Sequence, residues 1–83
     1  MKTIGMIGGM SWESSTVYYQ QINREVQRRL GGVHSARLLV HSFDFAEITA
    51  LWQSGDDDEA NRRIAQAAAG LERGGADFLF LAC

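Results

Sequence analysis

Short apolar segments alternate along this chain with longer segments of helical periodicity. Residues 3–7, 36–40 and 78–82 have the length and apolar content of β-strands, and the residues between them show helical patterns. Strands that alternate with helices predict a parallel sheet, because parallel neighbours need a long crossover connection. Two of the three segments are apolar on both faces, which is typical of a sheet covered by helices on both sides. We therefore predict an α/β fold in which right-handed crossovers place residues 3–7 between the other two strands.

The first helical segment begins near Ser11 and ends at a pair of glycines. Ser11 is a predicted N-cap, and Glu13 suits the positive end of a helix. Gly31 and Gly32 provide the stop, after two arginines that suit the negative end. An apolar stripe at every fourth residue predicts that one side of this helix packs against the sheet. The stripe contains Tyr18, Ile22, Val26 and Leu30.

Two further helices are predicted between the second and third strands. Asp44 is a predicted N-cap with Glu47 as its capping-box partner, and this helix ends at Gly55. The acidic residues 56–59 are interpreted as the cap and charged first turn of the next helix. A calcium loop is excluded because its alternating oxygen ligands and closing glutamate are absent. The last helix continues to Gly74.

The composition excludes several classes of protein. With 46% hydrophobic and 22% charged residues, the 83-residue chain is too apolar to be disordered. Its net charge of −2 and its lack of a basic stripe argue against nucleic-acid binding. No apolar run approaches the roughly 20 residues of a membrane-spanning helix, and the glycine-broken start does not resemble a signal peptide. We expect a cytoplasmic protein without a membrane partner, in which the one cysteine, Cys83, is a reduced thiol.

Three segments follow the predicted strands, at the edge where open parallel sheets bind ligands. They are residues 8–11, residues 41–44 and Cys83. Gly8 and Gly9 allow close backbone approach, and the helix start after them offers amides that suit a carboxylate or a phosphate. The alternative interpretation is a tight strand-to-helix turn with no ligand. The glycine spacing matches neither the dinucleotide-binding fingerprint nor the Walker loop.

Cys83 has two interpretations. A cysteine in an apolar strand is most often a small buried hydrophobic residue. At the carboxyl end of a strand, however, a helix start that follows would stabilise its thiolate. His34 precedes the second strand, at the opposite edge, and His41 is interpreted as the end of that strand. One cysteine and two separated histidines do not form a zinc-binding pattern, so no metal site is predicted.

Residues 1–15 read Met-Lys-Thr-Ile-Gly-Met-Ile-Gly-Gly-Met-Ser-Trp-Glu-Ser-Ser. This opening sequence resembles that of the aspartate/glutamate racemase family, and more closely that of its branch with broad amino-acid or L-aspartate/glutamate specificity. This resemblance implies that residues 1–83 form the amino-terminal part of the first of two similar α/β domains, with the second domain outside this chain. The match continues through residues 18–19, 22–23, 29–32, 34–36, 41–42, 44–45, 75–78 and 82–83.

The resemblance implies a cofactor-independent isomerase with its active site between two domains. Each domain of such a racemase supplies one thiol, the first in a Cys-Asn-Thr segment at a strand end and the second in a later Gly-Cys-Thr-Glu segment. Cys83 matches the first of these cysteines. One thiolate removes the α-proton while the thiol on the opposite face delivers a proton. Backbone amides and hydroxyls hold the substrate carboxylate in such a site, and Gly9, Met10 and Ser11 are suited to help there.

Two departures from the family leave the substrate side chain open. Relatives that bind a distal carboxylate often carry an arginine after the second strand, but residues 43–53 contain no Lys or Arg. Some relatives have a glutamine at the position of Trp52, and we expect Trp52 to border the substrate. The resemblance also implies a homodimer in the full-length protein and no activity in residues 1–83 alone. The alternatives are a related enzyme, such as a hydantoin racemase or an arylmalonate decarboxylase-like enzyme, and a non-catalytic fragment that binds a small anion.

Overall fold

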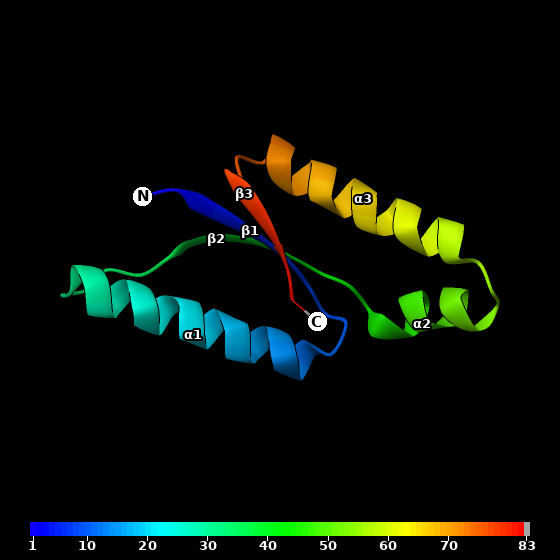
Figure 1. Ribbon diagram of the computed structural model, residues 1–83, viewed down its shortest axis with the longest axis horizontal. Coiled ribbons are helices and arrows are strands. Elements are labelled where there is room, and N and C mark those ends of the chain that lie inside the picture. Colours follow the sequence, from blue (N-terminus) through cyan, green and yellow to red (C-terminus); the bar gives the residue numbers. More distant parts are fainter. Residues whose placement is uncertain (83) are drawn as a thin grey trace.

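A three-stranded parallel sheet lies at the centre of the structure, a computed structural model that describes residues 1–82 (Figure 1). The strands are ordered β2-β1-β3, so the prediction that the first strand lies between the other two is confirmed. Strands alternate with helices, as the sequence predicts. The elements are β1 (Thr3–Gly8), α1 (Trp12–Leu30), β2 (Arg37–Ser42), α2 (Phe45–Gln53), α3 (Asp57–Arg73) and β3 (Phe78–Leu81).

The three strands reach the same edge of the sheet at their carboxyl ends. β1 pairs with β2 up to Gly8 and Ser42, and it pairs with β3 up to Ile7 and Leu81. The second strand is predicted over residues 36–40 with its end near His41 and Ser42, and β2 ends at Ser42, as predicted. The ladder with β1 satisfies the backbone groups of β2 as far as β1 extends.

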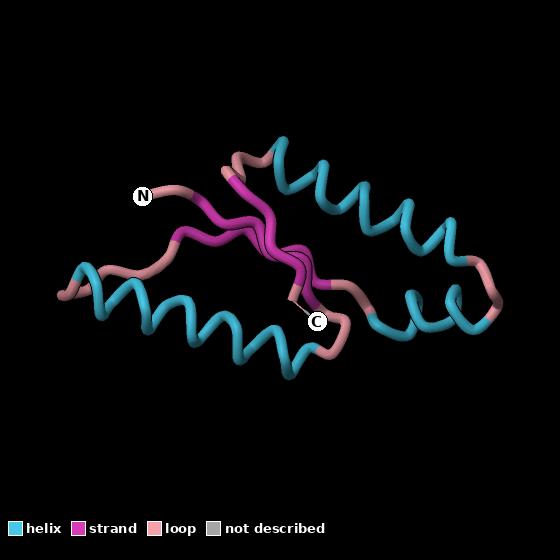
Figure 2. The backbone as a smooth tube through the Cα atoms, viewed as in Figure 1, coloured by secondary structure: helices cyan, strands magenta, loops and turns pink. Residues whose placement is uncertain are grey.

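Helices cover both faces of the sheet, and two glycines of β1 identify the faces. A Cβ on Gly5 would lie 2.9 Å from the Cβ of Ala76 and 3.3 Å from the Cβ of Leu71, on the α3 side. A Cβ on Gly8 would lie 2.5 Å from Ser15 Oγ, on the α1 side. Figures 1 and 2 show α1 on one side of the strands and α3 on the other. The predicted α/β fold with a helix-covered parallel sheet is therefore confirmed.

The main hydrophobic core lies where the sheet meets α2 and α3. Ile48 of α2 is completely buried, so this short helix contributes an anchoring side chain. Among the residues that the structure describes, no helix combines the length and apolarity needed to cross a bilayer. The buried core residues are Ile7, Met10, Ile48 and Leu71, and Leu39, Phe43, Ile64, Ala68 and Ala76 pack against them.

Two aspartates cap helices as the sequence predicts. Asp44 Oδ1 accepts a hydrogen bond of 3.1 Å from the amide of Ala46, at the start of α2. Asp56 Oδ1 accepts one of 3.2 Å from the amide of Glu59, at the start of α3. The acidic residues 56–59 are therefore a helix start. Within residues 1–82, Glu47 makes no reciprocal side-chain bond to Asp44, so the predicted capping box is only half formed.

Candidate functional site

The turn after β1 meets the end of β2 at the carboxyl edge of the sheet. The amide of Phe43 donates a hydrogen bond of 2.9 Å to the carbonyl oxygen of Gly8. Gly9 has a φ of +87°, and a Cβ there would collide with backbone atoms of Phe43. Glycine alone combines this left-handed conformation with so close an approach. The predicted convergence of residues 8–11 with residues 41–43 is therefore confirmed.

Ser15 holds the same turn from the α1 side. The amide of Gly9 donates a hydrogen bond of 3.0 Å to Ser15 Oγ, and Ser15 is only 9% exposed. Ser15 is the one buried polar residue in the part of the chain that the structure describes. Sequence reasoning missed this residue. The signal that could have found it is its place on the apolar stripe of α1, three residues before Tyr18, where a serine faces inward.

Ser11 begins α1 with an unusual backbone. Its φ of 79° lies in the left-handed region, and its side chain makes no capping hydrogen bond to the helix. Its hydroxyl lies 3.3 Å from Glu13 Oε2 and 3.3 Å from Ser14 Oγ instead. Ser11 is therefore at the predicted N-cap position, but it does not cap the helix with its side chain. A serine needs an extended backbone for its oxygen to reach the amides of the first helical turn.

Two amides of this turn have no partner among residues 1–82. The N–H groups of Met10 and Ser11 donate to no acceptor in that part of the chain. They lie at the positive end of α1, where a carboxylate or a phosphate is stabilised. The side chain of Met10 belongs to the core and Met10 is 7% exposed, so its backbone is the part that can face a ligand. This is the edge at which open α/β sheets hold small molecules.

β3 brings the chain to the same edge immediately before Cys83. The amide of Ala82 donates a hydrogen bond of 2.9 Å to the carbonyl oxygen of Ile7, and Ala82 is fully buried. Cys83 is the next residue and lies outside the described residues, so the predicted place of its thiol stays a prediction. Among residues 1–82, no group of three or more His, Cys, Asp and Glu side chains could hold a metal ion.

Trp52 lies near the end of α2 and packs against the first residue of that helix. The ring centroids of Trp52 and Phe45 are 6.2 Å apart, in an edge-to-face arrangement. Phe45 directly follows Asp44, just beyond the carboxyl end of β2. Trp52 is 42% exposed, so part of its ring is open to a binding partner. The predicted contact between Trp52 and a substrate stays a prediction. Trp52 is connected to the carboxyl edge through its packing against Phe45.

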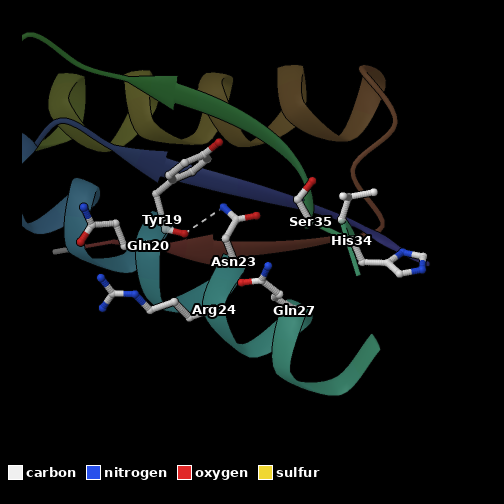
Figure 3. A pocket seen from close by; sticks show the side chains of 8 residues that line it. Tyr19, Gln20, Asn23, Arg24, Gln27, His34 and Ser35 are labelled. Carbon is white, nitrogen blue, oxygen red and sulfur yellow. Dashed lines mark hydrogen bonds between the residues drawn. The ribbon is translucent and has the colours of Figure 1, made fainter. Parts of the chain in front are cut away.

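A large hollow lies at the opposite edge of the sheet. Figure 3 shows it between the second half of α1 and the segment before β2, and its volume is about 480 Å³. Asn23 fixes this segment, since its Oδ1 accepts a hydrogen bond of 2.8 Å from the amide of Ala36. His34 lines the hollow, so the prediction that it lies away from the carboxyl edge is confirmed. His41 belongs to β2, as predicted.

The shifted carboxyl groups of the chain belong to ion pairs on helix surfaces. Hydrogen bonds from Arg28 and Arg29 lower the pKa of Glu25 to about 2. Glu59 has arginines at the same two spacings, and their hydrogen bonds also lower its pKa to about 2. Pairs three and four residues apart stabilise the helix that carries them. These two glutamates are therefore structural groups.

Comparisons with known proteins identify the family. Residues 7–83 match the family described as Asp/Glu/Hydantoin racemase. A candidate Asp/Glu racemase from Yersinia pestis has 43% identity to this chain and a TM-score of 0.96. An aspartate racemase homologue from Pyrococcus horikoshii OT3 has 34% identity and a TM-score of 0.75. Both matches cover 100% of this chain but 36% of the solved chain. The chain therefore belongs to the Asp/Glu/Hydantoin racemase family, as the opening sequence predicts.

Proposed function

We propose that this chain supplies one half of the active site of an amino-acid racemase, an isomerase that inverts the α-carbon of aspartate, glutamate or a similar small amino acid. The observation that carries the proposal is the convergence of three segments on one edge of the sheet. These are the turn at Gly9, the end of β2 and the residue that precedes Cys83. Family membership supports the class of reaction.

Cys83 is the proposed base on one face of the substrate. Its thiolate takes the α-proton, and the electron pair of the broken C–H bond stays on the α-carbon and spreads into the adjacent carboxylate. An acid on the opposite face then donates a proton to the α-carbon, and the two groups exchange roles in the reverse reaction. That second group is the cysteine of a second domain, outside these residues. The scheme requires no cofactor.

The turn at Gly9 is the proposed binding site for the substrate carboxylate. The N–H groups of Met10 and Ser11 would donate to the carboxylate oxygens at the start of α1. The positive end of the helix would stabilise the charge that grows on the carboxylate as the α-proton leaves. Gly9 contributes the shape of the turn, because its own amide is bonded within the chain. Trp52 is proposed to border the substrate side chain from α2.

A thiol variant tests the proposed base in the full-length protein that carries these residues. Cys83→Ala is expected to abolish racemisation, and Cys83→Ser is expected to weaken it greatly because a serine hydroxyl is far less acidic than a thiol. The measurement is entry of solvent deuterium at the α-carbon of L- and D-aspartate and glutamate. Thr16→Ala is the control, since within residues 1–82 its hydroxyl bonds only the carbonyl oxygen of Trp12 in its own helix. Normal rates in Cys83→Ala would make the cysteine a packing residue.

The substrate is tested in the same assay. The family description also names hydantoin, so a 5-substituted hydantoin belongs beside the amino acids. Deuterium entry into the hydantoin and into no amino acid would replace the proposed substrate and keep the two-base reaction.

This chain spans 36% of the length of the solved relatives, so the proposed activity is that of a full-length protein that carries these residues. We expect the full-length protein to be a cytoplasmic homodimer.

We expect residues 1–83 alone to lack racemisation, because one thiol leaves no proton donor on the other face. They are also expected not to form a stable monomer. β3 is an edge strand whose Phe78, Leu79 and Leu81 are 43% to 49% exposed, and such an edge promotes association.

Expression of residues 1–83 tests both expectations. A cooperative thermal transition of a monomer, recorded by circular dichroism, would contradict the folding expectation. Deuterium entry that disappears with Cys83→Ala would contradict the catalytic one.

A further inference from the structure

We propose that Ser15 is a positioning residue of the racemase site. Its hydroxyl binds the amide of Gly9 and so fixes the turn in which the next two amides, those of Met10 and Ser11, face the substrate carboxylate. The catalytic role of Ser15 rests on the proposed function. The hydrogen bond between Ser15 and Gly9 is a feature of the structure and does not depend on that proposal.

The bond of Ser15 differs from those of the two helical threonines. Thr16 and Thr49 donate to the carbonyl oxygen four residues earlier in their own helix, at 3.1 and 2.7 Å. Such bonds are an ordinary use of a helical hydroxyl. Ser15 Oγ instead accepts from Gly9, outside its helix, at a buried position. Ser15 Oγ thus satisfies the buried amide of Gly9, and a buried amide without an acceptor is costly.

The turn is held on two sides, and each contact leaves no room for a side chain. On one side, Ser15 Oγ lies where a Cβ of Gly8 would approach it to 2.5 Å. On the other side, the amide of Phe43 bonds the carbonyl oxygen of Gly8, and its backbone occupies the place of a Cβ on Gly9. The peptide group that joins Gly8 to Gly9 is therefore fixed by two bonds, one at its carbonyl oxygen and one at its amide. The turn that these glycines form sets the direction of the two amides that follow.

This arrangement divides the amides of the turn into two kinds. The Gly9 amide is bonded to Ser15 and is not available to a ligand. The amides of Met10 and Ser11 have no acceptor within residues 1–82. Ser11 also has a left-handed backbone, which few residues other than glycine adopt without cost. The hydrogen bond from Gly9 to Ser15 holds the chain two residues before this strained residue.

The test uses a pair of variants of equal shape in the full-length protein. Ser15→Thr keeps the hydroxyl, and Ser15→Val replaces it with a methyl group. Thr16→Ala is the control at the neighbouring position. Hydrogen exchange of ¹⁵N-labelled glycine amides reports the bond directly. Deuterium entry into L-aspartate reports kcat and KM for the reaction.

Ser15→Val is expected to accelerate exchange of the Gly9 amide about tenfold or more and to leave Gly70 in α3 unchanged. It is expected to lower kcat/KM about 10- to 100-fold, since misplaced binding groups have effects of that size. Ser15→Thr and Thr16→Ala are expected to resemble the natural protein in both measurements. In the natural protein, added L-aspartate is expected to shift the amide resonances of Met10 and Ser11 more than that of Gly9.

The possible failures are distinct. Unchanged Gly9 exchange in Ser15→Val overturns the inference and leaves the proposed function intact. Faster Gly9 exchange with unchanged kcat/KM makes Ser15 a purely structural residue and also overturns it. A natural protein that protects Gly9 but racemises none of aspartate, glutamate and a 5-substituted hydantoin overturns the proposed function, and the catalytic part of the inference with it. If Ser15→Val does not fold, exchange at Gly9 in Ser15→Ala decides the same question.

Discussion

The two faces of the sheet are packed in different ways. On the α3 face, small residues let the helix approach closely: a Cβ on Gly5 would lie 3.3 Å from the Cβ of Leu71 in α3, and Ala67 is buried. On the α1 face, larger side chains separate helix and sheet, as where Tyr18 meets Phe80 with ring centroids 5.0 Å apart. That face also carries hollows of about 390 and 260 Å³. Four large apolar residues of α1 are at least 50% exposed, namely Trp12, Val17, Tyr19 and Leu30.

The two faces therefore have different roles: the α3 face mainly stabilises the fold, and the α1 face helps to position the turn at Gly9. The α3 face contains the buried cluster to which Met10 and Ile48 belong, and it anchors the turn through the Met10 side chain. The α1 face contributes fewer buried apolar residues, but it supplies the hydroxyl of Ser15 that holds Gly9. The turn at the carboxyl edge is thus supported by packing on one side and by a hydrogen bond on the other. Substitutions on the α3 face should mainly change stability.

The largest expected effect is at Ile48. Ile48→Ala removes a completely buried side chain and is expected to destabilise the full-length protein by about 2–5 kcal/mol. Val17→Ala is the matched change on α1, where the residue is 50% exposed, and it is expected to change stability by less than about 0.5 kcal/mol. Urea unfolding measures both. Equal losses would show that the two faces contribute alike to stability.

A smaller effect with a change of sign is expected at two glycines. Gly5→Ala places a Cβ 2.8 Å from Leu79 Cδ2 and 2.9 Å from the Cβ of Ala76, and it is expected to destabilise the protein by about 1–3 kcal/mol. Gly70→Ala meets no atom closer than 3.9 Å, and it is expected to stabilise α3 by about 0.5–1 kcal/mol. The difference between their melting temperatures is the measurement. A neutral Gly5→Ala would contradict the close packing of Leu79 and Ala76 against Gly5.

The smallest effect is a pH dependence shared by both helices. The pKa values of Glu25 and Glu59 are lowered from 4.5 to about 2, so the folded state favours both carboxylates. Their contribution is fully present above about pH 4.5 and is lost as the pH falls toward 2. The side chain of Glu59 is 25% exposed and that of Glu25 is 47% exposed, so solvent screens Glu59 less.

The corresponding variants separate the two pairs. Glu59→Gln is expected to reduce the loss of stability between pH 7 and pH 3 more than Glu25→Gln does. Urea midpoints at the two pH values provide the comparison. The opposite ranking would show that exposure does not govern these pairs.

Much of the fold could be predicted because its signals are local. Glycine pairs and capping aspartates act on neighbouring residues, so α1 ends at Leu30 before Gly31, and Asp44 and Asp56 cap the helices that they precede. The order of the strands followed from the handedness of crossovers. The carboxyl-edge rule then located the turn at Gly9. Family resemblance, rather than spacing, supplied the reaction.

The sequence by itself determined the order of the elements along the chain, the central position of β1 in the sheet and the edge that carries the turn. Apolar periodicity and glycine stops determine the elements because they act over a few residues. The tertiary structure alone decided that Ser11 is left-handed and that Ser15 Oγ accepts a hydrogen bond from the amide of Gly9. Each of these depends on which segment lies opposite another. That pairing results from the packing of residues far apart in the chain, and no local pattern encodes it.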